Sequence, residues 1–133
     1  MKQAASAVLI FALLCGCVTR DDVQTPVPDA LVAGWKGQKA CELLQEKPSY
    51  RVLRCTFPPG AGHERHYHPP HFGFALSGGK AELIDASGTR EAVIATGSSF
   101  TSNGTAWHEM RNIGESVIAY IIVEEKGAAA PGR

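Results

Sequence analysis

Hydrophobic and polar side chains alternate along several short stretches of this chain. In residues 52–57, Leu53, Cys55 and Phe57 occupy every second position, and in residues 72–77 large apolar side chains alternate with small ones. Successive side chains of a strand point to opposite faces, so a period of two predicts a β-strand with one buried face. We therefore expect a strand in each of these stretches.

Turns rich in glycine, proline and small polar residues separate these stretches at regular intervals. The turns fall at residues 58–62, 78–79, 85–88, 97, 102–104 and 113–115. Further strands are expected between them, at residues 80–84, 90–95, 100–101, 107–112 and 116–125. About eight short strands with such punctuation predict an all-β domain, either a β-sandwich or a small barrel. Only residues 30–44 leave room for a helix, which would be short.

The first sixteen residues have the pattern of an export signal. A short basic start, residues 1–3, precedes an uncharged and mostly apolar run of eleven, residues 4–14. Eleven residues are too few to span a bilayer of about 30 Å as a helix, so the run is interpreted as a signal-peptide core. The sequence Leu14-Cys15-Gly16-Cys17 that follows resembles the bacterial lipobox.

This lipobox resemblance implies that Cys17 is lipidated and becomes the new N-terminus. Because residue 18 is Val and not Asp, it also implies sorting to the outer membrane, with the protein facing the periplasm. Acyl chains on one cysteine anchor a protein firmly when more than one is attached. The alternative is an ordinary secretory signal cleaved nearby, which would leave a soluble periplasmic or secreted protein.

Four segments are therefore expected. They are a signal peptide at residues 1–16, a lipidated N-terminus and flexible tether at 17–34, one domain at 35–126 and a disordered tail at 127–133. The chain holds 13 basic and 13 acidic residues over 133 positions, and removal of the signal peptide takes away one lysine. The near-neutral charge and the absence of a basic patch argue against nucleic-acid binding.

Two cysteines remain in the expected domain, Cys41 and Cys55. They lie in strand-like runs on either side of a turn and are each seven residues from Pro48. A hairpin centred there would place them opposite each other at about 4.5–5.5 Å, close to the Cα separation of a disulfide. Since the periplasm permits disulfides, we predict this bond; two buried, inert free thiols are the alternative.

All five histidines fall in two short segments. The first holds His63, His66, His68 and His71, and the second holds His108. Histidine is the commonest ligand of first-row transition metals, so such a cluster indicates a metal site, with a solvent-exposed loop as the plainer alternative. Residues one apart on a strand share a face, so His66 and His68 can chelate one ion.

The two histidine segments together resemble the two sequence motifs of the cupin family. The first is carried by Gly60, His66, His68 and Gly78, and the second by Gly97, Asn103, His108 and Asn112. The resemblance covers roughly residues 39–125. It implies a single-domain jelly-roll β-barrel with metal ligands that project inward from its strands.

This chain departs from the cupin pattern where the family carries a glutamate ligand. Counting back from Gly78, that position is His71. The resemblance therefore implies that one divalent transition metal ion is bound by His66, His68, His71 and His108. Imidazole ligands do not distinguish iron, copper, zinc, nickel and manganese here. His63, on the preceding loop, is expected to be exposed or to lie behind the ligands.

Strand alternation extends this picture to the neighbours of the ligands. If His71 points inward, Gly73 and Ala75 do so too, and their small size leaves open volume beside the metal. Phe72, Phe74 and Leu76 then face the other way, where they pack under another sheet or form a homodimer surface. The candidates for holding an anion are Arg54, Arg65 and Arg111, although each is also typical of an ordinary surface charge.

The function predicted from these features is that of an exported, lipid-anchored metal-binding protein that binds or acts on a small anionic molecule. Without a carboxylate ligand, the charge of the ion is uncompensated, which favours anionic or enolic oxygen donors. An oxygen-dependent enzyme is the first possibility, with hydrolase or isomerase chemistry as its enzymatic alternative. A non-catalytic module that binds a metal or small ligand is the other, and open coordination positions distinguish the two.

Overall fold

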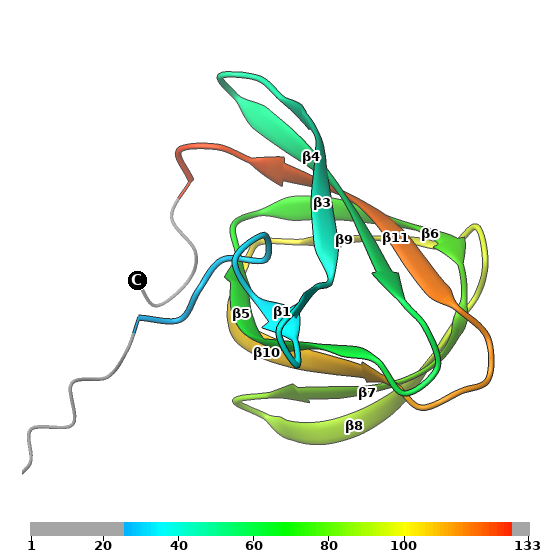
Figure 1. Cartoon of the computed structure of the whole chain (residues 1–133). Helices are drawn as coiled ribbons and strands as arrows, with labels where there is room; N and C mark the ends of the chain where they lie inside the picture. Colours follow the sequence, from blue (N-terminus) through cyan, green and yellow to red (C-terminus); the bar gives the residue numbers. More distant parts are fainter. Residues whose placement is uncertain (1–25, 129–133) are drawn as a thin grey trace, which may run out of the picture.

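The computed structural model describes residues 26–128 as a barrel of antiparallel strands (Figure 1). The strands are β1 (Gly34–Trp35), β2 (Gln38–Lys39), β3 (Cys41–Glu46), β4 (Tyr50–Phe57), β5 (Gly62–His68), β6 (His71–Ser77), β7 (Gly79–Asp85), β8 (Gly88–Ile94), β9 (Ser99–Ser102), β10 (Thr105–Asn112) and β11 (Ile118–Glu125). The predicted signal peptide, Cys17 and residues 129–133 of the predicted tail lie outside the described residues. Within residues 26–128 there is no helix that could cross a membrane.

The all-β prediction is confirmed, and the short helix that residues 30–44 left room for does not form. That segment contains β1 and β2, joined by the two-residue turn Lys36–Gly37, and the beginning of β3. Both turn residues have positive φ, 50° and 80°. A two-residue hairpin turn of this kind matches the twist of its strands and is incompatible with a helix.

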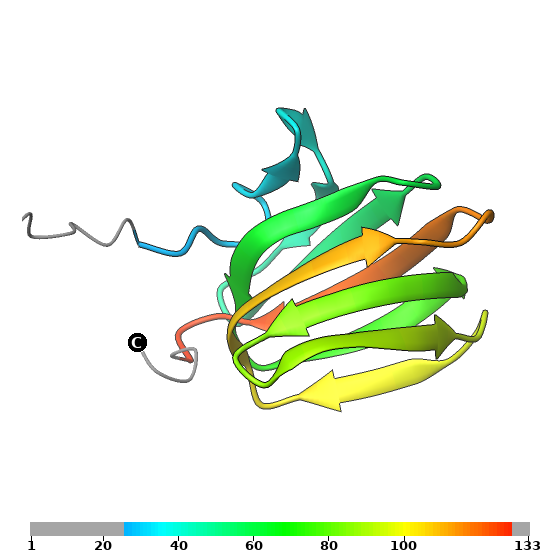
Figure 2. The same ribbon diagram turned by 90° about the horizontal axis from the view of Figure 1, so that it is seen from below.

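Two sheets face each other and form the barrel (Figure 2). The first has four strands in the order β5-β10-β7-β8, and the second has five in the order β3-β4-β11-β6-β9. Several strands that are consecutive in the chain, such as β5 and β6 or β10 and β11, lie in different sheets, which agrees with the jelly-roll arrangement. The histidine-bearing strands β5 and β10 are therefore direct neighbours although some forty residues separate them.

The core lies between the two sheets and follows the predicted alternation. Leu53, Cys55 and Phe57 of β4 are each at most 3% exposed, and Ile118 and Ile122 of the neighbouring β11 complete this layer. Burying one such aliphatic or aromatic side chain stabilises a fold by roughly 1.5–3 kcal/mol. On the outer face, the large apolar side chains of β6 are exposed and are not packed under a second sheet; they are Phe72, Phe74 and Leu76.

Strands β3 and β4 pair with Cys41 directly opposite Cys55. The two residues form a disulfide with a Cα–Cα distance of 4.0 Å. This is the pairing that the hairpin register predicted. The bond ties the edge strand of the five-stranded sheet to the strand that contributes Leu53, Cys55 and Phe57 to the core.

The packed part of the chain begins before residue 35. We call residues 28–33 the N-terminal strap. Its Ala30 is fully buried, and the backbone N–H of Tyr67 donates to the carbonyl of Pro28 at 3.0 Å. Asp29 forms an isolated parallel bridge with Tyr67, so the strap lies along β5. The segment predicted to be a tether thus ends in a region that is part of the domain.

Candidate metal centre

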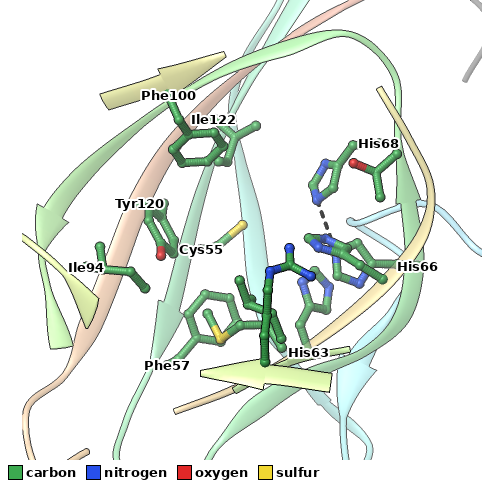
Figure 3. Close-up of a pocket in the computed structure, with 14 residues that line it drawn as sticks. Cys55, Phe57, His63, His66, His68, Ile94, Phe100, Tyr120 and Ile122 are labelled. Atoms are coloured by element: carbon green, nitrogen blue, oxygen red, sulfur yellow. Dashed lines mark hydrogen bonds between the residues drawn. The ribbon is translucent and has the colours of Figure 1, made fainter. Parts of the chain in front are cut away.

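Three histidines converge on one point inside the barrel. His66 and His68 project from the same face of β5, and His108 of β10 is the antiparallel partner of His66. The Nε2 atom of His66 lies 3.0 Å from Nε2 of His68 and 2.8 Å from Nε2 of His108. Figure 3 shows His66 and His68 meeting through these nitrogens. The three side chains together form a group that can hold a metal ion.

The hydrogen bonds behind these rings define their tautomers. His66 Nδ1–H donates to the carbonyl of Glu64 at 2.6 Å, and a carbonyl can only accept. His68 Nδ1–H donates to Glu124 Oε1 at 2.5 Å. When both rings are neutral, both Nε2 atoms carry lone pairs that face each other at 3.0 Å, and a metal ion bound to both nitrogens relieves their repulsion. The donor set thus fits a bound metal ion.

The environment of the site keeps two of its imidazoles neutral, those of His66 and His108. Burial, followed by the nearby charge of other histidines, lowers the pKa of His108 to about 3. The same two causes hold the pKa of His66 far below its usual value of 6.5. A neutral imidazole is the form that binds a metal, so at neutral pH these two ligands need no deprotonation.

His71, the expected fourth ligand, is not part of the group. It lies on β6, in the opposite sheet, and its Nδ1–H donates to the carbonyl of Pro69 at 2.8 Å. Its ring packs edge-on against Phe100, with the two centroids 5.8 Å apart. The proline bend brings the ring of His71 to 4.8 Å from that of His68, centroid to centroid, but its ring nitrogens do not lie within 4.8 Å of those of all three other histidines.

His63 is not exposed, and of the two positions expected for it, the one behind the ligands is correct. It is 2% exposed, and its ring stacks on His66 with centroids 3.6 Å apart. Its Nε2–H donates to the carbonyl of Ala30 at 3.0 Å. Burial, then the charge of His68, lowers its pKa to about 4. His63 is thus a neutral ring that stacks behind His66 of the candidate site.

Glu124 is the site residue that the sequence analysis missed. It is fully buried, and it accepts from His68 through Oε1 and from Arg51 Nε through Oε2, each at 2.5 Å. Burial opposes its ionisation, but His68 and Arg51 outweigh this and hold its pKa below the usual value. The sequence did hold a sign of this role. Alternation along β11 places Tyr120, Ile122 and Glu124 on the face that points into the barrel, and a charged side chain on that face needs a buried partner.

A cavity of about 300 Å³ adjoins the histidines. Its wall is mostly apolar and includes Phe57, Leu83, Ile94, Phe100 and Tyr120. In Figure 3 the labelled histidines lie on one side of it, and Ile94, Phe100 and Tyr120 lie across from them. Burial raises the pKa of Tyr120 to about 12, so this side chain lines the cavity as a neutral phenol.

The open volume does not lie over Gly73, where the sequence analysis expected it. Gly73 and Ala75 do face inward and are buried, as alternation predicted. However, a Cβ at position 73 would overlap the ring of Phe100, so that ring occupies the space over the glycine. The absence of a side chain at Gly73 therefore leaves space for the ring of Phe100, which is part of the cavity wall, and not for a ligand.

None of the three arginines proposed for anion binding lines the cavity. Arg54, Arg65 and Arg111 form ion pairs on the surface with Glu42, Glu109 and Glu82. The guanidinium of Arg65 also stacks on the ring of Trp107, 3.9 Å from its centroid. The arginine that lines the cavity is Arg90, from β8, which is paired with Asp85 at 2.5 Å. The local pattern of β8 gave no indication of this.

The sequence is similar to one known protein family. The sequence model of the family described as "Cupin domain" matches residues 53–124, more than half of the chain. No curated protein matches the sequence.

Several solved structures share the fold. A cupin domain from Bordetella pertussis Tohama I is 18% identical with a TM-score of 0.61, and the match covers 77% of this chain and 99% of that one. A cupin-like protein from Thermotoga maritima is 15% identical with a TM-score of 0.54, over 65% and 68% of the two chains. A protein from Thermus thermophilus is 21% identical with a TM-score of 0.50, over 69% and 84%. At these identities the likeness concerns the fold, and the family match agrees with it: this chain belongs to the cupin domain family.

Proposed function

We propose that this protein binds one divalent transition metal ion through His66, His68 and His108 and uses it to hold a small anionic ligand. The observation that carries the proposal is the pair of opposed Nε2 lone pairs of His66 and His68 at 3.0 Å. With both rings neutral, a metal ion bound to the two nitrogens relieves the repulsion of their lone pairs. The ion would supply a Lewis-acidic binding position at one end of the cavity.

A three-histidine site leaves coordination positions open. Metal centres that bind substrates use three protein ligands and keep the next position free, whereas structural zinc sites are closed by four. Four imidazoles, including His71, would have closed a tetrahedron. The position of His71 outside the group of three therefore favours a ligand-binding centre over a structural one.

The lining of the cavity favours an anion with an apolar body. Three neutral imidazoles do not compensate the double charge of the ion. Among the described residues that line the cavity, none is acidic, and Arg90 is the one with a permanent positive charge. A guanidinium has five N–H donors, so its pairing with Asp85 leaves others for a ligand. The aromatic and aliphatic wall matches a hydrocarbon or aromatic portion of the same molecule.

Binding of benzoate to the metal-loaded protein tests this specificity. We expect Arg90→Gln to weaken the binding roughly tenfold or more, because a charge-assisted hydrogen bond contributes about 1.5–3 kcal/mol. Isothermal titration calorimetry measures the affinity. Arg111→Gln is the matched control, since it removes a surface arginine paired with Glu82 outside the cavity. Equal affinity for both variants would contradict a role of Arg90 in ligand binding.

The same cavity is compatible with catalysis or with binding alone. Glu124 is no candidate for a general base, because both of its oxygens are engaged by His68 and Arg51. An oxygen-dependent reaction, which requires open positions at the metal, is the enzymatic candidate. The metal-loaded protein is therefore to be tested for oxygen uptake on a panel of small acids. Uptake that depends on His66 and His68 indicates an enzyme, and ligand binding without uptake indicates a non-catalytic module.

We also propose that the protein is exported and anchored through a lipid on Cys17. The support is the sequence of residues 1–17 and the disulfide between Cys41 and Cys55, a bond typical of oxidising compartments. Mass spectrometry of the mature protein from a bacterial host should find a diacylated N-terminal Cys17. An unmodified N-terminus at another residue would refute the anchor.

A further inference from the structure

We infer that the N-terminal strap, residues 28–33, is a positioning element of the metal centre that reaches two ligands through two separate chains of contacts. Both chains begin on neighbouring residues of the strap, Asp29 and Ala30. They end on His68 and His66, respectively. The inference rests on the proposed function, since it assigns a role in holding the same ligands.

The first chain of contacts consists of ion pairs and runs across the barrel. Asp29 Oδ2 accepts from Arg51 Nη1 at 3.0 Å, and Arg51 Nε donates to Glu124 Oε2 at 2.5 Å. The other carboxylate oxygen of Glu124 accepts from His68 Nδ1–H, also at 2.5 Å. Arg51 and Glu124 are direct cross-strand partners on β4 and β11, so the sheet itself holds them side by side. The chain thus joins the strap to a metal ligand through three consecutive contacts.

The second chain runs through the backbone of the strap and a ring stack. The carbonyl of Ala30 accepts from His63 Nε2–H at 3.0 Å, which leaves the ring of His63 fixed in one orientation. That ring lies against His66 with an interplanar angle of 26°. Ala30 and His63 are 0% and 2% exposed, so neither contact competes with water.

Hydrogen bonds within the strap and to β5 hold it in place, so that it can fix the orientation of the side chains bound to it. Asp29 Oδ1 accepts from the N–H of Leu31 at 2.7 Å, and the Asp29 carbonyl accepts from the N–H groups of Val32 and Ala33. The bond from Tyr67 N–H to the Pro28 carbonyl ties it to β5 at the residue between the two ligands. Figure 1 shows the strap, in blue, running beside β5.

The physical effect of such contacts is to fix ring orientation and raise ligand basicity. A carboxylate on the far nitrogen of a ligating imidazole does both, and its removal commonly lowers metal affinity about 10–100-fold. Arg51 is a long side chain with many rotamers, and an ion pair on each side restricts it. Asp29 therefore acts on His68 by keeping Arg51 directed at Glu124.

The test uses three variants of the full-length protein. Glu124→Gln keeps an oxygen for His68 but removes the charge, and Asp29→Asn removes only the outer end of the ionic chain. Glu42→Gln is the matched control, because it breaks an ion pair with Arg54 on the surface of β3 and β4. Cobalt(II) is the probe, with affinity from chelator competition and geometry from the ligand-field absorption spectrum. Thermal unfolding of the metal-free proteins shows whether each variant is folded.

We expect cobalt affinity to fall about 10–100-fold in Glu124→Gln and by a smaller factor in Asp29→Asn, with altered absorption spectra in both. Because Asp29 acts only through Glu124, the double variant should bind as weakly as Glu124→Gln alone, and not by the product of the two effects. Should Glu124→Gln fail to fold, Asp29→Asn, whose side chain is 23% exposed, decides the matter.

Each other result overturns the inference. Suppose that Asp29→Asn has the same affinity and spectrum as Glu42→Gln, while cobalt binding in the wild type is lost on replacing His66 and His68. The ionic route from the strap to His68 would then be refuted, and the metal site would stand. If the losses of cobalt affinity caused by the two substitutions multiply in the double variant, Asp29 does not act through Glu124. Absence of cobalt binding in the wild type would overturn the proposed function together with this inference.

Discussion

Replacing His66 and His68 together by alanine is expected to reduce bound metal from about one ion per chain to below about 0.1. The two residues supply two of the three Nε2 donors, and His108 alone cannot hold a divalent ion against solvent. The loss should therefore exceed the roughly 10–100-fold effect that is usual for residues behind a metal ligand. Elemental analysis of protein purified without added metal, and again after loading and dialysis, measures the content.

His71→Ala is the decisive control for the number of ligands. In the structure its ring nitrogens lie outside the group formed by His66, His68 and His108, so metal affinity should stay within a few-fold of the wild type. An affinity as low as that of the His66 and His68 variants would restore the four-histidine site that the family resemblance implied. Wild-type protein that stays below about 0.1 ion per chain after loading would rule out the metal site altogether.

The metal-free protein is expected to lose stability steeply as the pH falls below about 6.5. Burial lowers the pKa of His63 to about 4 and that of His108 to about 3, against 6.5 for an ordinary histidine. Above pH 6.5 the imidazoles are neutral in both the folded and the unfolded chain, so their contribution is fully present. Below it the unfolded chain binds protons that the folded chain cannot, and the free energy of unfolding falls.

Each such histidine should cost roughly 2 kcal/mol between pH 6.5 and pH 5. Several together are a large fraction of the stability of a domain of this size. Urea unfolding of chelator-treated protein at a series of pH values from 7.5 to 5 measures the slope. Carboxylates such as Glu124, whose pKa is lowered, add to the loss only below about pH 4.5 and so do not affect this window.

The variant His63→Gln isolates one of these groups. Glutamine can still donate to the Ala30 carbonyl but does not titrate, so the slope should decrease by about one proton. The slope is the readout, and a uniform loss of stability at all pH values does not change it. A free energy of unfolding that stays constant from pH 7.5 to 5 would show that these histidines are protonated in the folded state.

Several elements were predictable because local periodicity determines them. The alternation in residues 52–57 placed Leu53, Cys55 and Phe57 on one buried face, and the same logic put His66 and His68 together. The opposition of Cys41 and Cys55 followed from their equal distance to a turn. In each case the partners lie on one strand or one hairpin, where a count of residues is enough to set the geometry.

The errors concern residues whose partners lie on distant strands. Glu124 meets His68 from the opposite sheet, and Arg90 rather than Arg54, Arg65 or Arg111 lines the cavity. The volume expected beside Gly73 is filled by Phe100, which comes from β9. No period in the sequence encodes these distances, because they depend on which strands pair, as β6 and β9 do, and on how the two sheets are stacked.

The sequence by itself determined the all-β class, the cupin resemblance and the face that His66 and His68 share. The class and the shared face follow from side-chain alternation and turn chemistry, which act over a few residues, and the resemblance follows from two sequence motifs. Only the tertiary structure decided that three histidines converge while His71 stays outside their group, that His63 stacks on His66, and that the strap reaches His68 through Arg51 and Glu124. Such contacts join residues far apart in the chain, 73 positions in the case of Arg51 and Glu124, and only the closing of the barrel brings them within bonding distance.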